Sequence, residues 1–355
     1  MKFRLIFLIL FVCVVNAWSQ AYKYSNEFLS LGVGGRALAM GNATVASVSD
    51  INAGYWNPSA MVGLQNNLNL GVMHASYFGD LAKYDYGAVA IKNSDSSAFG
   101  ISIIRVGVDD IPNTLELVDA NGNFDYSKLS SFSVADYAAL LSYARKLKQI
   151  EHFDYAVNVK IIRRVVGDFA SAWGFGFDAA AHYTYKNFLL GAIIRDVTST
   201  FNAWHYNTST FEEAFIKTGN AIPSDGLEIT TPKLIIAAAY QHAIKEKFSI
   251  LAELDADFTF DKKRNTLIKS SFASIDPHAG IEMSYMKMIF VRAGLSNIQH
   301  VTSMSGKNVL NVQPSIGIGI EYKRFGIDYA FTDIGNASAA LYSNVVSLKY
   351  GFDRK

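Results

Sequence analysis

Three acidic residues, Glu253, Asp255 and Asp257, stand at alternate positions of one otherwise apolar run. In an extended strand such positions share a face at a spacing of about 7 Å, so the three carboxylates would be neighbours. Neighbouring carboxylates can carry out general acid–base chemistry or bind calcium. Neither a nucleophile–base motif nor an oxygen-rich loop accompanies them. The sequence therefore predicts a protein that is not an enzyme, with no catalytic residue and no metal ligand.

The glycine-rich segment Gly32–Ala37 is a second candidate for chemistry, because it formally fits the dinucleotide-binding pattern G-x-G-x-x-A. That pattern binds a dinucleotide only where it joins a strand to a helix beside a parallel sheet. The sequence shows no alternation of strands with helices. We therefore expect a compact glycine-rich turn and no cofactor.

The composition of the 355-residue chain is apolar and aromatic: 50% of the residues are hydrophobic, 13% are aromatic and 18% are charged. Ordinary soluble domains carry about 25% charged residues, and this deficit excludes a disordered chain. The formal net charge of +1 gives no basic field, so nucleic acid is not an expected partner.

The N-terminus carries a long apolar run, Leu5–Val15, behind Lys2 and Arg4. A run this short does not span a bilayer as a helix, and its basic start and small-residue end are typical of a secretory signal peptide. We expect a signal peptide over residues 1–19. The single cysteine, Cys13, lies inside it, so the mature chain would have no disulfide and no thiol chemistry.

From Asn66 onward, apolar residues alternate with polar or very small ones, as in strands with one apolar face. The alternation predicts roughly fourteen strands, many of which reach the about 9–11 residues that a tilted membrane-spanning strand needs. Their predicted starts are Asn66, Ala82, Ser96, Ser133, His152, Ser171, Asn187, Thr231, Lys247, Ile275, Met288, Asn311, Arg324 and Ser343. The sequence therefore predicts an all-β fold, an antiparallel transmembrane β-barrel over residues 66–355.

The connections between these strands alternate in length. Short turns are expected at Asn93–Asp95, Lys148–Glu151, Tyr185–Asn187, Ile244–Glu246, Tyr285–Lys287 and Tyr322–Arg324, and longer loops at Asp109–Phe132, Thr198–Thr230, Asp261–Asp276, Gln299–Leu310 and Asp333–Tyr342. Two connections on the long side, Phe78–Leu81 and Gly167–Ala170, are short exceptions. Such alternation is typical of bacterial outer-membrane barrels, with the short turns in the periplasm. We expect the outer membrane of a Gram-negative bacterium, with both termini periplasmic. The alternative fold, a large secreted β-sandwich, has no reason to alternate in this way.

Residues 20–65 lack this alternation and are rich in Gly, Ala, Ser and Asn. A barrel of roughly fourteen strands has a lumen that something must fill, and this periplasmic or plug segment precedes the barrel. Asn57 and Pro58 predict a short helix through Met61, with Asn57 as its N-cap. We expect Trp56 to pack against the inner wall.

The polar strand face would line the lumen, because lipid covers the apolar face. This face carries the charged residues Asp178, Glu253, Asp255, Asp257, Glu282, Arg292, Glu321 and Asp328. The simplest interpretation is a wet or ion-paired lumen. Burial of Arg36 in the plug would need a partner, and we expect an inward-facing acid such as Glu253, Asp255 or Asp328.

The long loop Thr198–Thr230 carries an aromatic cluster that includes Trp204, Tyr206, Phe211 and Phe215. Apolar residues on an exposed loop indicate either a protein-binding surface or a lid over the barrel mouth. We take these four as candidate partner-binding residues.

Two segments carry a family resemblance: Phe28–Gly41, with the pattern G-x-x-x-R-A-x-x-M-G, and Ala53–Ser59, with Y-W-N-P-S. Asp50 lies between them, and the strand-rich end Gly326–Phe352 is also similar. Together they resemble the PorV/PorQ-like outer-membrane proteins, although Ser59 stands where the family typically has alanine. The matching plug-motif residues are Gly32, Gly35, Arg36, Met40, Gly41, Asp50, Trp56, Asn57 and Pro58.

The resemblance implies a FadL-like barrel with an N-terminal plug and a role in type IX secretion. The partners would be outer-membrane lipid and proteins, either a secretion translocon subunit or the C-terminal domain of secreted cargo. The alternative is a FadL-like transporter, whose partner would be a hydrophobic small molecule. A transporter predicts an apolar internal pocket leading to a gap in the wall. A secretion partner predicts a charged lumen and an apolar external mouth.

Overall fold

The computed structural model describes residues 25–77, 79–118, 122–261, 263–302, 306–332 and 343–353. The predicted signal peptide, residues 1–19, lies outside these ranges. Within them, no helix is both long and apolar enough to cross a membrane.

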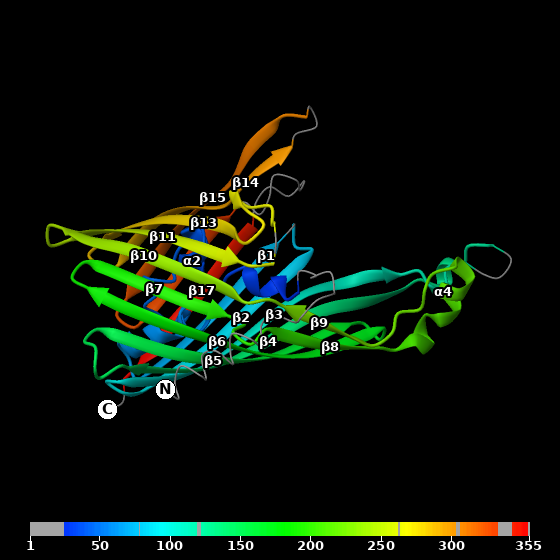
Figure 1. Cartoon of the computed structure of the whole chain (residues 1–355), viewed down its shortest axis with the longest axis horizontal. Helices are drawn as coiled ribbons and strands as arrows, with labels where there is room; N and C mark the ends of the chain where they lie inside the picture. Colours follow the sequence, from blue (N-terminus) through cyan, green and yellow to red (C-terminus); the bar gives the residue numbers. More distant parts are fainter. Residues whose placement is uncertain are drawn as a thin grey trace, which may run out of the picture.

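In the described part of the chain, seventeen strands form one antiparallel sheet, and fourteen of them close into a barrel where β17 pairs with β1 (Figure 1). The strands of the ring are β1 (Leu68–Tyr77), β2 (Ala82–Ser94), β3 (Ser97–Asn113), β4 (Ser130–Lys146), β5 (Phe153–Val166), β6 (Ala170–Tyr185), β7 (Phe188–Arg195), β10 (Lys233–Ile244), β11 (Phe248–Thr259), β13 (Ser274–Tyr285), β14 (Ile289–Thr302), β15 (Asn308–Tyr322), β16 (Phe325–Thr332) and β17 (Ser343–Phe352). The predicted barrel is confirmed, and each predicted strand start lies within three residues of the observed one.

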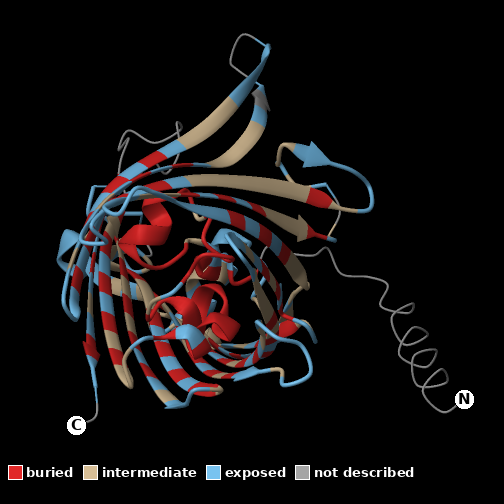
Figure 2. Ribbon diagram, turned by 90° about the vertical axis from the view of Figure 1, so that its left-hand side faces the viewer, coloured by how far each residue is buried: buried red, intermediate tan, exposed pale blue. Residues whose placement is uncertain are grey.

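The two faces of the barrel wall alternate residue by residue. On β11, Leu254 is 67% exposed, whereas its neighbours Glu253 and Asp255 are 1% and 3% exposed. Figure 2 shows the same alternation of buried and exposed bands around the ring. The outer face is thus apolar, and the polar residues point into the lumen, as a lipid-facing barrel requires.

The lumen is filled by residues 25–64, which form short helical turns inside the ring (Figure 2). These are η1 (Glu27–Ser30), α2 (Gly35–Ala39), α3 (Ala53–Trp56) and η2 (Pro58–Gly63). The Asn57 side chain accepts a hydrogen bond from the Ser59 N–H at the start of η2, so the predicted N-cap is confirmed, on a 3₁₀ helix. We call residues 25–64 the plug.

The turns that connect β2 to β3, β4 to β5, β6 to β7, β10 to β11, β13 to β14 and β15 to β16 are short and lie at one end of the barrel. We call this the short-turn end and the opposite one the long-loop end. At the long-loop end the outer parts of β3 and β4 continue past the ring, together with β8 (Thr200–Tyr206), α4 (Glu212–Thr218) and β9 (Gly226–Thr230), as a projection (Figure 1).

The prediction of a loop over Thr198–Thr230 is therefore wrong, because β8 pairs with β6 and β9 pairs with β8. The reason lies in strand length: β6 has 16 residues but β7 has only 8. The outer half of β6 would otherwise leave its backbone groups unpaired, and β8 supplies the partner. Three further elements lie in the predicted loops: η3 (Tyr126–Lys128), η4 (Thr208–Thr210) and β12 (Ile268–Lys269).

Candidate functional site: the plug and its contacts with the barrel wall

A chain of ion pairs joins the plug to the wall. The Arg36 Nε lies 2.8 Å from Glu282 Oε2 on β13, and the same oxygen lies 2.5 Å from Arg292 Nε on β14. Arg292 in turn pairs with Asp328 on β16 at 2.7 Å. The expected acid partners of Arg36, Glu253, Asp255 or Asp328, are thus wrong, and the actual partner is Glu282. The position of the plug along the wall decides which acidic residue pairs with Arg36. That position cannot be read from the sequence pattern.

The Arg36 Nη2 also donates to Glu282 Oε1 at 3.4 Å, and the other hydrogen bonds of Arg36 stay within the plug. Its Nη1 donates to Thr44 Oγ1 and to the Ser47 carbonyl at 3.3 Å each, and its Nη2 donates to Ser47 Oγ at 3.1 Å. Burial opposes the charge, but Glu282 outweighs it and raises the pKa of Arg36 above its usual value. The guanidinium therefore stays charged, and its hydrogen bonds to Thr44 and Ser47 hold residues 44–47 close to it.

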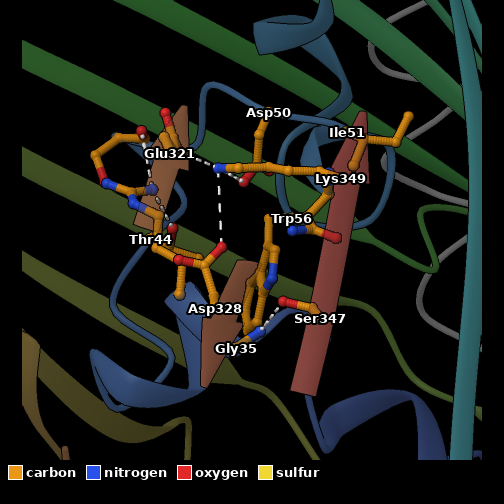
Figure 3. A network of polar contacts seen from close by, with 12 residues as sticks. Gly35, Thr44, Asp50, Ile51, Trp56, Glu321, Asp328, Ser347 and Lys349 are labelled. Atoms are coloured by element: carbon orange, nitrogen blue, oxygen red, sulfur yellow. Dashed lines mark hydrogen bonds and ion pairs between the residues drawn. The ribbon is translucent and has the colours of Figure 1, made fainter. Parts of the chain in front are cut away.

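Lys349 on β17 holds the plug from the other side (Figure 3). Its Nζ lies 3.2 Å from Asp50 Oδ2 and 3.8 Å from Asp328 Oδ2, and it also pairs with Glu321. The Asp50 side chain is only 12% exposed. Burial alone would raise the pKa of Asp50, but the nearby Lys349 and Arg36 charges lower it below its usual value. The motif residue Asp50 is therefore a plug anchor.

The acids that suggested acid–base chemistry bind the plug backbone. Asp255 Oδ2 accepts the Thr44 and Val45 N–H groups at 3.0 Å each, and Glu253 Oε1 accepts the Ala46 N–H at 2.6 Å and the Ser47 N–H at 3.3 Å.

Asp257, the third of those acids, pairs with Lys233 at 3.0 Å. Over the ranges that the structure covers, no group of three or more His, Cys, Asp or Glu side chains is placed to hold a metal ion. The three acids are structural partners of cations and N–H groups.

The motif glycines lie where the plug backbone touches the wall. A Cβ on Gly41, which has φ +64°, would lie 2.6 Å from the Leu295 nitrogen, and one on Gly35 would lie 2.9 Å from the Asp328 carbonyl oxygen. The Gly35 N–H donates to Ser347 Oγ at 2.9 Å. Met40, between these glycines, is fully buried. Larger side chains at Gly35 and Gly41 would clash with the wall and displace the plug from it.

The second half of the motif packs the plug on itself. The Trp56 indole N–H donates to the Val33 carbonyl at 2.8 Å, and a Cβ on Gly32 would lie 2.9 Å from the Trp56 ring. Asn57 Nδ2 donates to the Val45 carbonyl at 2.9 Å and to the Ala181 carbonyl of the wall at 3.2 Å.

The departure at Ser59 has a local reason, because its hydroxyl donates to Asn57 Oδ1 at 2.5 Å. Pro58 opens η2, as its fixed φ and missing N–H favour. The Asn57 side chain thus accepts hydrogen bonds from both the backbone N–H and the hydroxyl of Ser59.

Sequence reasoning missed Arg195, at the end of β7. Its guanidinium carbon lies 4.5 Å from the centre of the Tyr55 ring and 5.8 Å from that of Trp56, and it donates to the carbonyls of Leu29 and Tyr55 at 3.3 Å each. The signal was present in the alternation Gly191, Ile193, Arg195, which places this cation on the inward face.

The wall is irregular just after Arg195. Asp196 and Ser199 have positive φ values of 56° and 61°, and residues 196–199 bulge between β7 and β8. Lys160 lies 2.8 Å from Asp178 and also pairs with Asp196, while the Asp196 N–H donates to Asp178 Oδ1 at 2.9 Å. Plug residues Leu29 and Tyr55 lie against the inner side of this bulge and line a small cavity with Asp196.

A cavity of about 430 Å³ opens beside the plug near the short turns. Its lining includes the ion-paired residues Arg36, Asp50, Glu282, Arg292 and Lys349. The lumen is therefore charged at this end, as predicted. The cavity differs from the apolar pocket that we would expect in a transporter of hydrophobic molecules.

The four candidate partner-binding residues lie in the projection. Phe211 is 6% exposed and packs against Phe215 and Phe169, with ring centres 4.8 and 6.4 Å apart. Trp204 and Tyr206 are half-buried and stack on each other, and the Trp204 N–H donates to Glu228 at 3.0 Å. Phe211 is thus an internal residue of the projection.

Comparison with known proteins gives a result for structure alone. No family model and no curated protein matches the chain by sequence. Its structure resembles CymD, a monoaromatic hydrocarbon channel, with a TM-score of 0.57 and 11% identity over 91% of this chain and 98% of that one. The Pseudomonas putida toluene transporter TodX gives 0.57 and 13% over 91% and 99%, and a Pseudomonas aeruginosa FadL homologue gives 0.50 and 14% over 90% and 97%.

The fold is FadL-like. Identities this low establish the fold alone, and the similarity to PorV/PorQ-like proteins stays a prediction from the motif. All nine motif residues nevertheless have a place in the plug, as contacts with the wall or as its internal caps and packing.

Replacing Glu282 by Gln tests the central ion pairs. The change leaves Arg36 and Arg292 buried near a neutral amide, and we expect a loss of about 3–5 kcal/mol in the free energy of unfolding. Urea unfolding followed by tryptophan fluorescence measures it. The matched control is Asp353→Asn, whose partner Arg324 is 49% exposed and which should cost at most about 1 kcal/mol. Equal losses in both variants would show that the pairs do not hold the plug.

The lowered pKa of Asp50 predicts a pH dependence. A carboxyl with a folded-state pKa below its usual 3.8 stabilises the fold above that pH, and this contribution is lost as the pH falls through the lower, folded-state pKa. We expect Asp50→Asn to be less stable than the wild type at neutral pH and the difference to shrink below about pH 4. Unfolding free energies measured from pH 7 to pH 3 check this. A difference that stays constant with pH contradicts it.

Proposed function

We propose that this chain is a non-enzymatic outer-membrane barrel that passes small hydrophobic molecules across the membrane, with its short-turn end and both termini in the periplasm. The observation that carries the proposal is the plugged barrel of FadL-like fold, with an irregular connection between β7 and β8 at residues 196–199 beside plug residues Leu29 and Tyr55. The plug blocks the lumen in the structure, so passage requires it to shift.

The resemblance to solved structures supports this choice over a secretion role. CymD is described as a hydrocarbon channel and TodX as a toluene transporter. The match with this chain covers nearly the whole length of both proteins. Passage through FadL-like barrels, as implied by the resemblance, uses a lateral opening in the wall. In this chain we take the bulge after Arg195 as the candidate for such an opening.

The contacts at the bulge indicate how such an opening would be controlled. Arg195 joins the wall to the rings of Tyr55 and Trp56, and Leu29 lies against the same region. If Leu29 and the neighbouring helix α3 with Tyr55 move together, the bulge loses its inner cover. The polar lumen then serves to seat the plug, while the hydrophobic molecule travels near the wall.

A reversible disulfide between plug and wall tests this mechanism. A Cβ on Gly54 would lie 3.0 Å from Ser102 Oγ, so cysteines at 54 and 102 would lie close enough to be joined by a disulfide. We expect the oxidised Gly54→Cys, Ser102→Cys variant to lose at least about tenfold in toluene uptake into vesicles, because the plug cannot leave.

Reduction with dithiothreitol should restore uptake, and each single-cysteine variant is the control. Uptake that persists in the oxidised double variant would refute plug movement. A wild-type rate no higher than that of empty vesicles would refute transport itself.

A role as a protein partner in type IX secretion is the second candidate. The PorV/PorQ-like motif and the aromatic projection favour it. The projection exposes Phe124 by 64%, Tyr126 by 73% and Ile216 by 64%. A translocon subunit or cargo domain that docks here would use these side chains, since exposed aromatic residues are common interface anchors.

Changing Phe124, Tyr126 and Ile216 together to Ser tests the second candidate. The barrel should stay folded, because these side chains are exposed, while co-purification of secretion components from native membranes should be lost; aromatic anchors typically contribute about 2 kcal/mol or more each. The control changes the exposed neighbours Glu212 and Glu213 to Ser. Unchanged co-purification in the triple variant excludes this surface as the partner site.

A further inference from the structure

Positive charge collects at the short-turn end of the barrel, on the left of Figure 1. The short turns and the strand ends beside them, residues 92–97, 145–153, 185–188, 244–248, 285–289 and 322–325, expose the cations Arg145, Lys146, Lys148, Lys186, Lys245, Lys247, Lys287, Lys323 and Arg324. The exposed acids of the same stretches are Asp95, Glu151 and Glu246. Asp95 pairs with Lys92 at 3.7 Å and Glu151 with His152 at 3.4 Å, so neither neutralises one of these cations. The rim therefore carries an excess of positive charge.

The cations follow the rim as a belt and do not gather in one patch. The turns that carry them join β4 to β5, β6 to β7, β10 to β11, β13 to β14 and β15 to β16, which are neighbouring hairpins of the ring. Four of these hairpins contribute one lysine each at the same place in the turn, and among the described residues none of the four forms an ion pair: Lys186, Lys245, Lys287 and Lys323. We call these four the turn lysines. Their charges are free to meet a partner outside the chain.

The backbone at the turn lysines is unusual for this residue type. Lys186, Lys245, Lys287 and Lys323 have positive φ values of 54°, 61°, 54° and 56°. Residues with a side chain rarely adopt this conformation, and tight hairpins usually place Gly or Asn there. Residues that are kept in disfavoured conformations are concentrated at functional sites. Turn geometry does not explain four lysines at this position, whereas a role for their charge does.

An outward-facing girdle of aromatic side chains lies directly inside these turns. Its members are 37–57% exposed: Tyr185, Phe188, Tyr240, Phe248, Tyr285, Tyr322, Phe325 and Tyr350. Neighbours across the strands touch, since the ring centres of Phe188 and Tyr240 are 4.9 Å apart and those of Phe248 and Tyr285 are also 4.9 Å apart. Aromatic girdles of outer-membrane barrels lie at the level of the lipid headgroups. The girdle thus indicates where the membrane surface meets the short-turn end.

The lysine head groups lie beside this girdle. The Nζ of Lys186 is 5.2 Å from the ring centre of Tyr185, and that of Lys323 is 5.3 Å from the ring centre of Tyr322. Both ammonium groups are therefore at the level of the headgroup phosphates, where lysine is attracted to anionic lipid. A membrane surface that surrounds the barrel meets the whole belt at once, whereas a globular protein below the barrel would reach only part of it.

We propose that the belt of turn lysines is a binding surface for the anionic headgroups of phospholipids in the periplasmic leaflet. The aromatic girdle would hold the acyl chains close to the glycerol, and each lysine would contact a phosphate of the lipids that surround the wall. This inference rests on the proposed orientation, with the short turns in the periplasm, and does not depend on what the barrel transports or binds.

Native mass spectrometry of the purified full-length barrel tests the belt, with phosphatidylglycerol as the anionic probe and phosphatidylcholine as the zwitterionic one. We expect the wild type to bind phosphatidylglycerol at least about tenfold more tightly than phosphatidylcholine. The variant in which all four turn lysines are changed to Gln should lose most of this preference and prefer phosphatidylglycerol by less than about threefold.

The matched control removes the same number of charges at the opposite end. It changes four exposed lysines of the long-loop end to Gln: Lys128, Lys217, Lys263 and Lys269. This control should keep the wild-type preference. Changing the turn lysines to Asn gives a second measurement, because Asn tolerates a positive φ better than lysine does. The Asn variant should lose the lipid preference while its thermal stability stays equal or rises.

Equal wild-type affinity for the two lipids, a preference that the turn variants keep, or an equal loss in the control would each overturn the proposal. A fall in thermal stability in the Asn variant would assign the lysines to the turns themselves. Tighter binding of lipopolysaccharide through the same lysines would place the short turns in the outer leaflet, and capture of an acidic periplasmic protein without any lipid preference would assign the belt to a protein; both contradict the proposal. Toluene uptake is measured separately, so a failure of transport is distinguished from a failure of lipid binding.

Discussion

The burial of Arg36 between the plug and the Glu282 carboxylate is the interaction on which the rest of the structure depends. A guanidinium in a closed lumen needs a carboxylate and a full set of acceptors, and it obtains them from β13 and from residues 44–47 of its own segment. Arg292 then needs Asp328 as well as Glu282, and Asp328 also attracts Lys349, which holds Asp50. One buried cation thus extends into a network that joins four wall strands, β13, β14, β16 and β17, to both halves of the plug.

The same constraint explains why the lumen is polar although the chain as a whole is apolar. Apolar side chains predominate on the outer face of the wall, as contact with lipid requires, so most of the wall's charges collect inside, where a polar plug backbone can satisfy them. Glu253 and Asp255 show this well, because they accept four consecutive N–H groups that no helix or strand of the plug pairs. The acidic residues that suggest acid–base chemistry in the sequence therefore have a structural role, which is to bind the plug backbone.

Periodicity could predict the ring but not the contacts across it. Alternation along a strand is local, so the fourteen strand starts and the inward direction of Glu282, Arg292 and Asp328 follow from the sequence. The partner of Arg36 depends on how a loop of plug sits against a wall more than 200 residues away in the chain, and no local pattern contains that register. Arg195 was missed for a related reason, since its role needs the Tyr55 ring above it. The strands of the projection were missed because they form to pair the outer half of β6. That need comes from the sheet and leaves no pattern in the segment itself.

The plug precedes the barrel in the chain, yet almost every group that holds it comes from strands made later: Glu253, Glu282, Asp328 and Lys349 lie on β11, β13, β16 and β17. Its contacts with those residues are therefore among the most non-local in the molecule, and non-local contacts form late in folding. The contacts that hold this first segment are complete only when the last strand, with Lys349, is in place. A wall with the wrong register would present its carboxylates out of reach of residues 44–47. The plug thus acts as a check on the register of the finished barrel.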